Sequence, residues 1–154
     1  DSTSTKLGSD ECPALTSVMP QGCNAGSLMM HITEGAAGYF ENMWLWIADH
    51  MTDLLIESTN PVWPYGTASE HAFFYQYNIY NARNIFAGLL QTESPYIQPT
   101  PPPPAPFKGV LGKLPGDPDY TCTAGDEFNG CDESWSINIR RSANIFVVGA
   151  GLYT

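Results

Sequence analysis

A three-residue unit recurs along this chain and restricts the folds that it can adopt. Asn42-Met-Trp, Asn84-Ile-Phe and Asn144-Ile-Phe each place asparagine before an aliphatic and an aromatic residue, at the head of a strand-like run that follows a turn. The separations, 84 − 42 = 42 and 144 − 84 = 60 residues, are near multiples of about twenty. Such spacing is typical of parallel β-helices, in which asparagines at one corner of successive coils can bond to each other's amides.

Strand-like segments separated by turns fill the chain after residue 27. Aliphatic residues alternate with Trp44, Trp46 and Ala48 through residues 43–48, which is the period of a strand with two different faces. A helix is the alternative for residues 39–53. Further strands are expected at 28–33, 54–58, 73–80, 84–90, 134–140 and 142–153, and a turn-rich aromatic loop at 63–66. We therefore predict an all-β fold, a parallel β-helix, with a β-sandwich of shorter and more regular strands as the alternative.

Prolines and small polar residues mark the parts of the chain that do not form strands. Residues 1–27 are mostly Ser, Thr, Gly, Asp and Pro, and we expect a loop-rich lead-in there. Residues 95–118 hold most of the 13 prolines and can form neither a central strand nor a helix. Because too few residues follow for an independent domain, we interpret 28–154 as one partial β-helix with a Pro-rich excursion at 95–118.

The charge balance excludes several classes of partner. With a formal net charge of −10 and only 6 Lys and Arg, the chain has no basic face for nucleic acid, and an anionic membrane surface is not expected to attract it. No run is long and apolar enough to span a membrane. Few charged residues, many aromatic ones and many turn-formers suit a secreted, extracellular β protein that binds neutral ligands such as sugars.

The four cysteines form two local pairs, Cys12 with Cys23 and Cys122 with Cys131. Neither pair has the tighter spacing that is usual for zinc ligands. We predict two disulfides and hence an oxidising compartment, although four cysteines allow three connectivities.

Two glutamates are the candidate catalytic residues. Glu70 and Glu93 are separated by 93 − 70 = 23 residues, and each lies in a run of polar and aromatic residues beside a strand-like apolar segment. In a coiled parallel sheet this spacing returns the backbone to nearly the same place one coil further on, about 4.8 Å away. Hydrolysis of a glycosidic bond requires such a pair of carboxyl groups in one cleft. The alternative is that both are solvated loop acids.

Four longer motifs resemble glycoside hydrolase family 55, the exo-β-1,3-glucanases, or laminarinases. They are Gly38-Tyr-Phe-Glu-Asn-Met-Trp-Leu-Trp-Ile-Ala-Asp-His50, Tyr65-Gly-Thr-Ala-Ser-Glu-His71, Gln91-Thr-Glu-Ser-Pro-Tyr96 and Gly149-Ala-Gly-Leu-Tyr153. The resemblance implies two right-handed parallel β-helices side by side, with the active site between them. This chain would supply part of the second, so the rest of the same enzyme is an expected partner. Fungal members have about one more coil where Asp53 here precedes Leu54, which suggests that the sequence is incomplete at that point.

The resemblance also assigns roles to individual residues. Glu93 matches the general acid, and Glu70 the residue that holds the attacking water of an inverting reaction, for which the carboxyl groups lie roughly 6.5–9.5 Å apart. Trp46 and Tyr96 match sugar-contacting positions. Asp49 and His50 are expected to bind hydroxyls at the non-reducing end, and His71 is as consistent with a structural role as with a functional one. We expect Trp44 to pack in the core. The rival acids Glu34, Glu41 and Glu57 are not expected to form a site. Neither a metal nor a cofactor is expected.

Together these features predict a secreted, inverting hydrolase that cleaves β-1,3-glucan from the non-reducing end. One alternative is a β-helix enzyme for another polysaccharide, such as a pectin hydrolase or lyase. The other is a glucan-binding or structural β-helix without catalysis. The 154 residues alone are expected to be inactive, because the opposite wall of the cleft would be missing.

Overall fold

The computed structural model describes residues 26–47, 51–96, 98–121 and 131–154 of the chain. Apart from one short 3-10 helix, its regular elements are all β-strands, which confirms the all-β prediction. Its elements are β1 (Met30–Ile32), β2 (Gly38–Glu41), β3 (Trp44–Trp46), β4 (Thr52–Ile56), β5 (Val62–Tyr65), β6 (Ala68–Glu70), β7 (Tyr75–Tyr80), β8 (Arg83–Glu93), a 3-10 helix (Lys108–Val110), β9 (Trp135–Arg140) and β10 (Ala143–Gly151).

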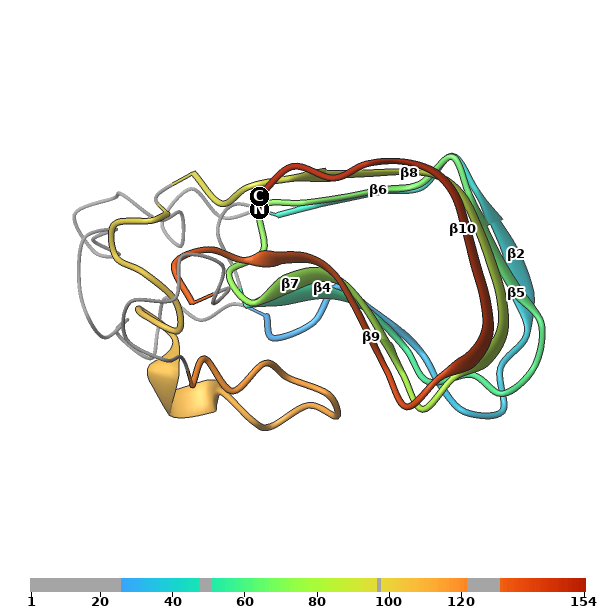
Figure 1. Ribbon diagram of the computed structural model, residues 1–154, viewed down its shortest axis with the longest axis horizontal. Coiled ribbons are helices and arrows are strands. Elements are labelled where there is room, and N and C mark those ends of the chain that lie inside the picture. Colours follow the sequence, from blue (N-terminus) through green and yellow to red (C-terminus); the bar gives the residue numbers. More distant parts are fainter. Residues whose placement is uncertain (1–25, 48–50, 97, 122–130) are drawn as a thin grey trace.

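The strands stack in coils whose turns repeat the same path (Figure 1). One sheet has the order β1-β4-β7-β9, and the other has the order β2-β5-β8-β6-β3, with β10 paired to β8. Met30 pairs with Leu54, and Leu54 with Tyr77, so one coil takes 54 − 30 = 24 or 77 − 54 = 23 residues. Every strand pair in the described residues is parallel. A sandwich is built from antiparallel strands, so this pairing disagrees with the sandwich alternative.

The chain turns sharply at one corner of each coil through a left-handed residue. In register these residues are Asn42, Gly66, Leu89 and Gly149, with φ of 54°, 60°, 56° and 73°. β8 therefore bends at Leu89, and its two halves line two walls of the stack (Figure 1). Asparagine and glycine adopt this left-handed conformation readily, whereas leucine adopts it at a cost in free energy.

The asparagine repeat is correct for two of its three members. The side-chain amide of Asn144 donates to Asn84 Oδ1 over 3.2 Å, one coil away, as an asparagine ladder predicts. Asn42 instead lies at the other corner, beside Gly66. The separation of 60 residues arises because the segment between β8 and β9 is inserted into one coil, and the separation of 42 is not a whole number of coils.

The core lies between the two sheets and is mainly aliphatic. β4 is buried along its whole length, and β7 over nearly all of it. The packed interior residues are Ile32, Leu54, Ile56, Val62, Tyr77, Ile79, Ala82, Ile85, Ala87 and Leu90. A second cluster, Met51, Phe73, Phe74, Tyr75 and Phe107, joins the coils to the Pro-rich segment.

The structure corrects two sequence predictions and bears on a third, the missing coil at Asp53. Residues 62–65 form strand β5 rather than a loop. Pro64 explains the error, because it cannot donate to the ladder, and β5 pairs with β8 only at Val62 and Tyr65. The helix alternative for 39–53 is wrong, since β2, β3 and β4 lie there. Asp53 and Leu54 are consecutive within β4, in a coil of ordinary length.

The segment between β8 and β9 forms no strand in its described residues. Cys131 is disulfide-bonded. Cys12, Cys23 and Cys122 lie outside the described residues, as does the lead-in up to residue 25, so the pairing and the domain limits stay predictions. Within the described ranges, no helix combines the length and apolar character needed to cross a membrane.

Candidate active site

Three residues from successive coils occupy one register position. Trp46 of β3 pairs with Glu70 of β6, and Glu70 pairs with Glu93 of β8. Successive side chains of a strand point to opposite faces. The preceding residues Ser69 and Thr92 are fully buried inside the coils, so Trp46, Glu70 and Glu93 share the outer face. The prediction that one coil separates the two glutamates is confirmed.

A second row lies two residues earlier on the same face and holds Glu70 in place. Trp44, Ala68 and Gln91 are register partners in it. Trp44 Nε1 donates to Glu70 Oε2 over 2.7 Å, and Gln91 Nε2 donates to Glu70 Oε1 over 3.1 Å and to Glu93 Oε1 over 3.2 Å. Gln91 thus joins the two carboxylates. Glu70 is only 4% exposed, whereas the Glu93 side chain is 48% exposed.

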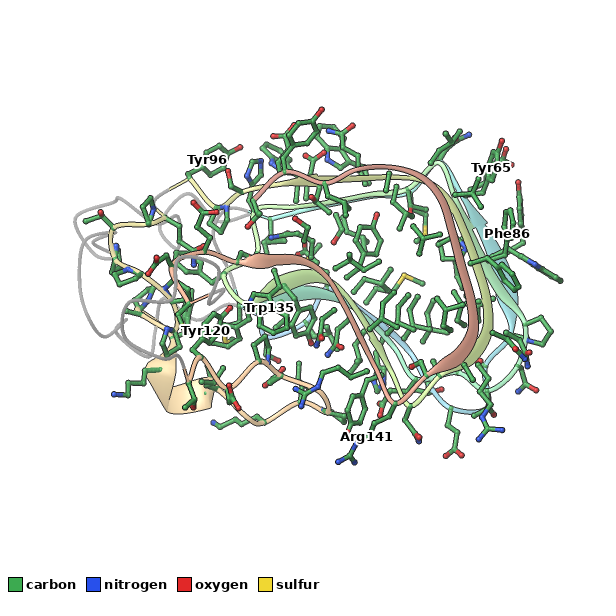
Figure 2. The ribbon with its side chains drawn as sticks, in the orientation of Figure 1. Tyr65, Phe86, Tyr96, Tyr120, Trp135 and Arg141 are labelled. Atoms are coloured by element: carbon green, nitrogen blue, oxygen red, sulfur yellow. The ribbon has the colours of Figure 1, made fainter. Side chains whose placement is uncertain are left out.

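Trp44 is therefore not a core residue, and that prediction is wrong. Its side chain is 64% exposed, because Leu45 and Ile47 take the inward positions of this segment. The rings of Trp44 and Trp46 stack with centroids 5.4 Å apart. Trp46 Nε1 donates to the hydroxyl of Tyr96 over 3.3 Å. Tyr96 lies along the upper edge of the molecule in Figure 2, far from the outward-pointing Tyr65 and Phe86.

His71 follows Glu70 and lies beneath Tyr96. Its ring is buried and stacks on Tyr96, with centroids 3.9 Å apart and planes 20° from parallel. Nδ1 lies 2.7 Å from the carbonyl oxygen of Ser94, and because a carbonyl only accepts, Nδ1 donates. Nε2 lies 3.4 Å from Glu93 Oε2.

These residues line a pocket of about 400 Å³, within the range of small-ligand sites. Its wall consists of Trp44, Trp46, Ala68, Glu70, His71, Gln91, Glu93 and Tyr96. Ligand atoms of Glu70, His71 and Glu93 all lie within 4.8 Å of one another. One oxygen of Glu70 and one of Glu93 thus lie within 4.8 Å of each other, a closer approach than the separation between carboxyl groups expected for inversion.

The same three residues could hold a cation, which the spacing of the histidines in the sequence did not suggest. Their carboxylate oxygens, however, already accept the N–H groups of Trp44 and Gln91. These hydrogen bonds indicate that the carboxylates act as hydrogen-bond acceptors rather than as metal ligands. The prediction that there is no metal site stays a prediction.

A buried carboxyl group lies behind Glu70. Asp53 of β4 is fully buried, and its Oδ2 lies 3.0 Å from Ser69 Oγ. Ser69 Oγ is also 2.7 Å from the carbonyl oxygen of Gln76, which can only accept. If the single hydroxyl proton goes to Gln76, Asp53 must donate the other hydrogen bond and be neutral. Burial, opposed by hydrogen bonds from Ser69 and Glu70, raises the pKa of Asp53 well above its ordinary value.

Two of the sequence-predicted site residues, Asp49 and His50, fall outside the described residues, so their binding roles stay predictions. None of the rival acids lines the pocket, and Glu57 lies 2.7 Å from His31 Nε2 instead. Gln91 received no role from the sequence, although its position two residues before Glu93 in a strand would have placed both on one face.

No protein-family model matches the chain. It is 37% identical, over 94% of its length, to a "non-secreted LysM effector" of Penicillium expansum, of which it covers 11%. It is 38% identical over 97% of its length to a "probable glucan endo-1,3-beta-glucosidase" of Arthroderma benhamiae, of which it covers 18%. It is 34% identical over 97% of its length to a "glucan 1,3-beta-glucosidase" of Cochliobolus carbonum, of which it covers 20%. The chain thus spans a fifth or less of these relatives.

Proposed function

We propose that the chain carries the catalytic pocket of a glycoside hydrolase that cleaves β-1,3-glucan. The observation that carries this proposal is the register stack of Trp46, Glu70 and Glu93. It brings two carboxylates together against aromatic rings in a pocket of about 400 Å³. The names of two relatives describe hydrolysis of 1,3-β-glucan, which favours this substrate.

The surroundings of the two glutamates support different roles for them. The carboxyl of Glu93 is partly exposed and can reach the oxygen of the bond to be cleaved, so it acts as the general acid. Glu70 is held by Trp44 and Gln91 at a fixed place beneath it and orients the attacking group. The exposed faces of Trp46 and Tyr96 cover the apolar C–H face of a glucose ring.

The finer parts of the proposal rest on the resemblance to glycoside hydrolase family 55. They are a right-handed parallel β-helix, attack from the non-reducing end, inversion, secretion, and a second β-helix in the same molecule that completes the cleft. The relatives' names include an endo-acting enzyme, and one name contains "non-secreted". The short distance between the glutamate oxygens is the observation that favours retention instead.

The substrate is tested by incubating the intact protein that contains these residues with laminarin and with polygalacturonate. We expect soluble sugar from laminarin alone. Release of glucose as the first product supports exo attack, and longer oligosaccharides support endo attack. Sugar release from polygalacturonate alone, or binding to laminarin without release, contradicts the proposal.

The stereochemistry is tested separately by ¹H NMR of the first product. Inversion at a β-bond gives the α-anomer first, with Glu70 placing water. If the β-anomer appears first, Glu70 acts as a nucleophile and the reaction retains configuration.

A further inference from the structure

We propose that His71 is a positioning residue for the reaction, fixing the Glu93 carboxyl on one side and the Tyr96 ring on the other. This inference rests on the proposed function. It assigns to one buried side chain the task of keeping the acid and the sugar-binding wall at a constant spacing.

The backbone of His71 explains how it reaches the pocket at all. In a regular strand, the side chain after Glu70 would point to the opposite face. His71 has φ of 69°, a left-handed conformation that is uncommon for residues other than glycine, and both side chains therefore line the same pocket. Backbone strain of this kind persists where the surroundings enforce it, often at functional sites.

Two hydrogen bonds lock the ring to the coil that carries Glu93. The His71 backbone N–H donates to the carbonyl of Glu93 over 3.0 Å, and Nδ1 donates to the carbonyl of Ser94 over 2.7 Å. With Nδ1 committed to a carbonyl, only Nε2 is available to the pocket, and it faces Glu93 Oε2 at 3.4 Å. Because Nδ1 carries a proton, this contact is attractive when a second proton lies between Nε2 and Oε2, on the imidazole or on the Glu93 carboxyl, and it then restrains a side chain that is 48% exposed.

The ring face of His71 restrains the other partner. Tyr96 is 60% exposed, yet it stacks on the buried imidazole and its hydroxyl accepts from Trp46. A wall ring supported in this way keeps its place over the sugar without being packed in the core. One side chain therefore couples the geometry of Glu93 to that of Tyr96.

The test uses His71→Asn and His71→Gln in the intact protein. The amide of Asn takes the place of Nδ1, so it can keep the bond to Ser94, and Asn tolerates positive φ. His71→Asn removes the contact between Nε2 and Glu93 Oε2, so Glu93 keeps only the hydrogen bond from Gln91 among the contacts described above. We expect kcat on laminarin to fall between about tenfold and a hundredfold, as for a catalytic group misplaced by an ångström. On an activated aryl β-glucoside the loss is expected to be much smaller, because that leaving group needs little protonation. His71→Gln places an amide near Nε2 and should recover part of the laminarin kcat.

His31→Asn is the matched control. His31 also bonds a glutamate one coil away, Glu57, but lies outside the pocket. The His31→Asn substitution should leave kcat unchanged on both laminarin and the aryl β-glucoside. Melting temperatures of all variants identify any general loss of structure, and if His71→Asn does not fold, the same substrate ratio is measured for His71→Gln.

Equal losses on both substrates, or no loss in either His71 variant, overturn the positioning role while the wild-type activity leaves the proposed function standing. If the wild type does not hydrolyse laminarin, the proposed function fails and the role of His71 falls with it.

Discussion

At the scale of single residues, the pocket depends on one buried acid that the proposed reaction does not use. Asp53 contacts Ser69, which precedes Glu70, and the Ser69 hydroxyl lies within hydrogen-bond distance of both Asp53 Oδ2 and the carbonyl oxygen of Gln76. Burial raises the pKa of Asp53 in the folded state above the value of about 3.9 in an unfolded chain. The folded protein therefore binds a proton that the unfolded chain releases.

This linkage gives a pH prediction. A raised folded-state pKa contributes stability that is fully present below pH ~4 and is lost as pH rises through the folded pKa. Asp53→Asn keeps a donor for Ser69 without a titrating group. As the pH rises from 4 to 8, we expect the urea midpoint of the wild type to decrease relative to that of Asp53→Asn. A constant difference between the two midpoints across this range would show that Asp53 is ionised in the fold.

At the scale of elements, the left-handed corner determines how each coil turns. Gly66 has φ of 60°, its N–H bonds to the carbonyl of Gly88, and an added Cβ would lie 3.2 Å from Asn42 Oδ1. The corners of β8 and β10 stack upon it at Leu89 and Gly149. A change at this corner should therefore affect the whole stack.

Gly66→Ala should lower the free energy of unfolding by about 1–2 kcal/mol, the cost of a left-handed conformation for a residue with Cβ. Gly35→Ala is the control, because a Cβ there meets nothing within 4 Å and its φ is not positive. Urea unfolding followed by circular dichroism measures both. Equal effects of the two substitutions would refute the role of the corner.

The sequence predicted the positions of the strands better than which of their side chains point outward. Alternation between residues 43 and 48 located β3, but hydrophobicity suggested that Trp44 is buried, whereas the pleat directs it outward. Pro64 concealed β5 because proline is rare in central strands. The one-coil spacing predicted that Glu70 meets Glu93. The sequence did not distinguish a functional from a structural role for His71, because its positive φ, which brings its ring to the pocket, cannot be predicted from the motif.

At the scale of the whole molecule, the strands of the last described coil, β9 and β10, are edge strands. In the described residues β10 pairs only with β8, and β9 only with β7. The apolar side chains of this coil are exposed, among them Phe146, Val148 and Tyr153. An exposed apolar edge strand is a template for association.

The 154-residue chain by itself should therefore self-associate, despite its net charge of −10. Light scattering after size exclusion should show a mass that rises with concentration. Val148→Lys should weaken this association by placing a charge on the edge, whereas Thr100→Lys adds the same charge in the Pro-rich segment and should not. A monomer at every concentration would contradict this prediction.

The central claim is that Glu70 and Glu93 form a catalytic pair with Glu93 as the acid. It is tested most directly by comparing kcat on laminarin and on an activated aryl β-glucoside for Glu93→Gln and Glu70→Gln in the intact protein. Glu93→Gln should lose roughly 10²–10⁴-fold on laminarin and far less on the aryl glucoside, and Glu70→Gln should lose activity on both alike. The reverse pattern would exchange the two roles. If neither variant loses more than about tenfold, ~1.4 kcal/mol of barrier, the pair is not catalytic.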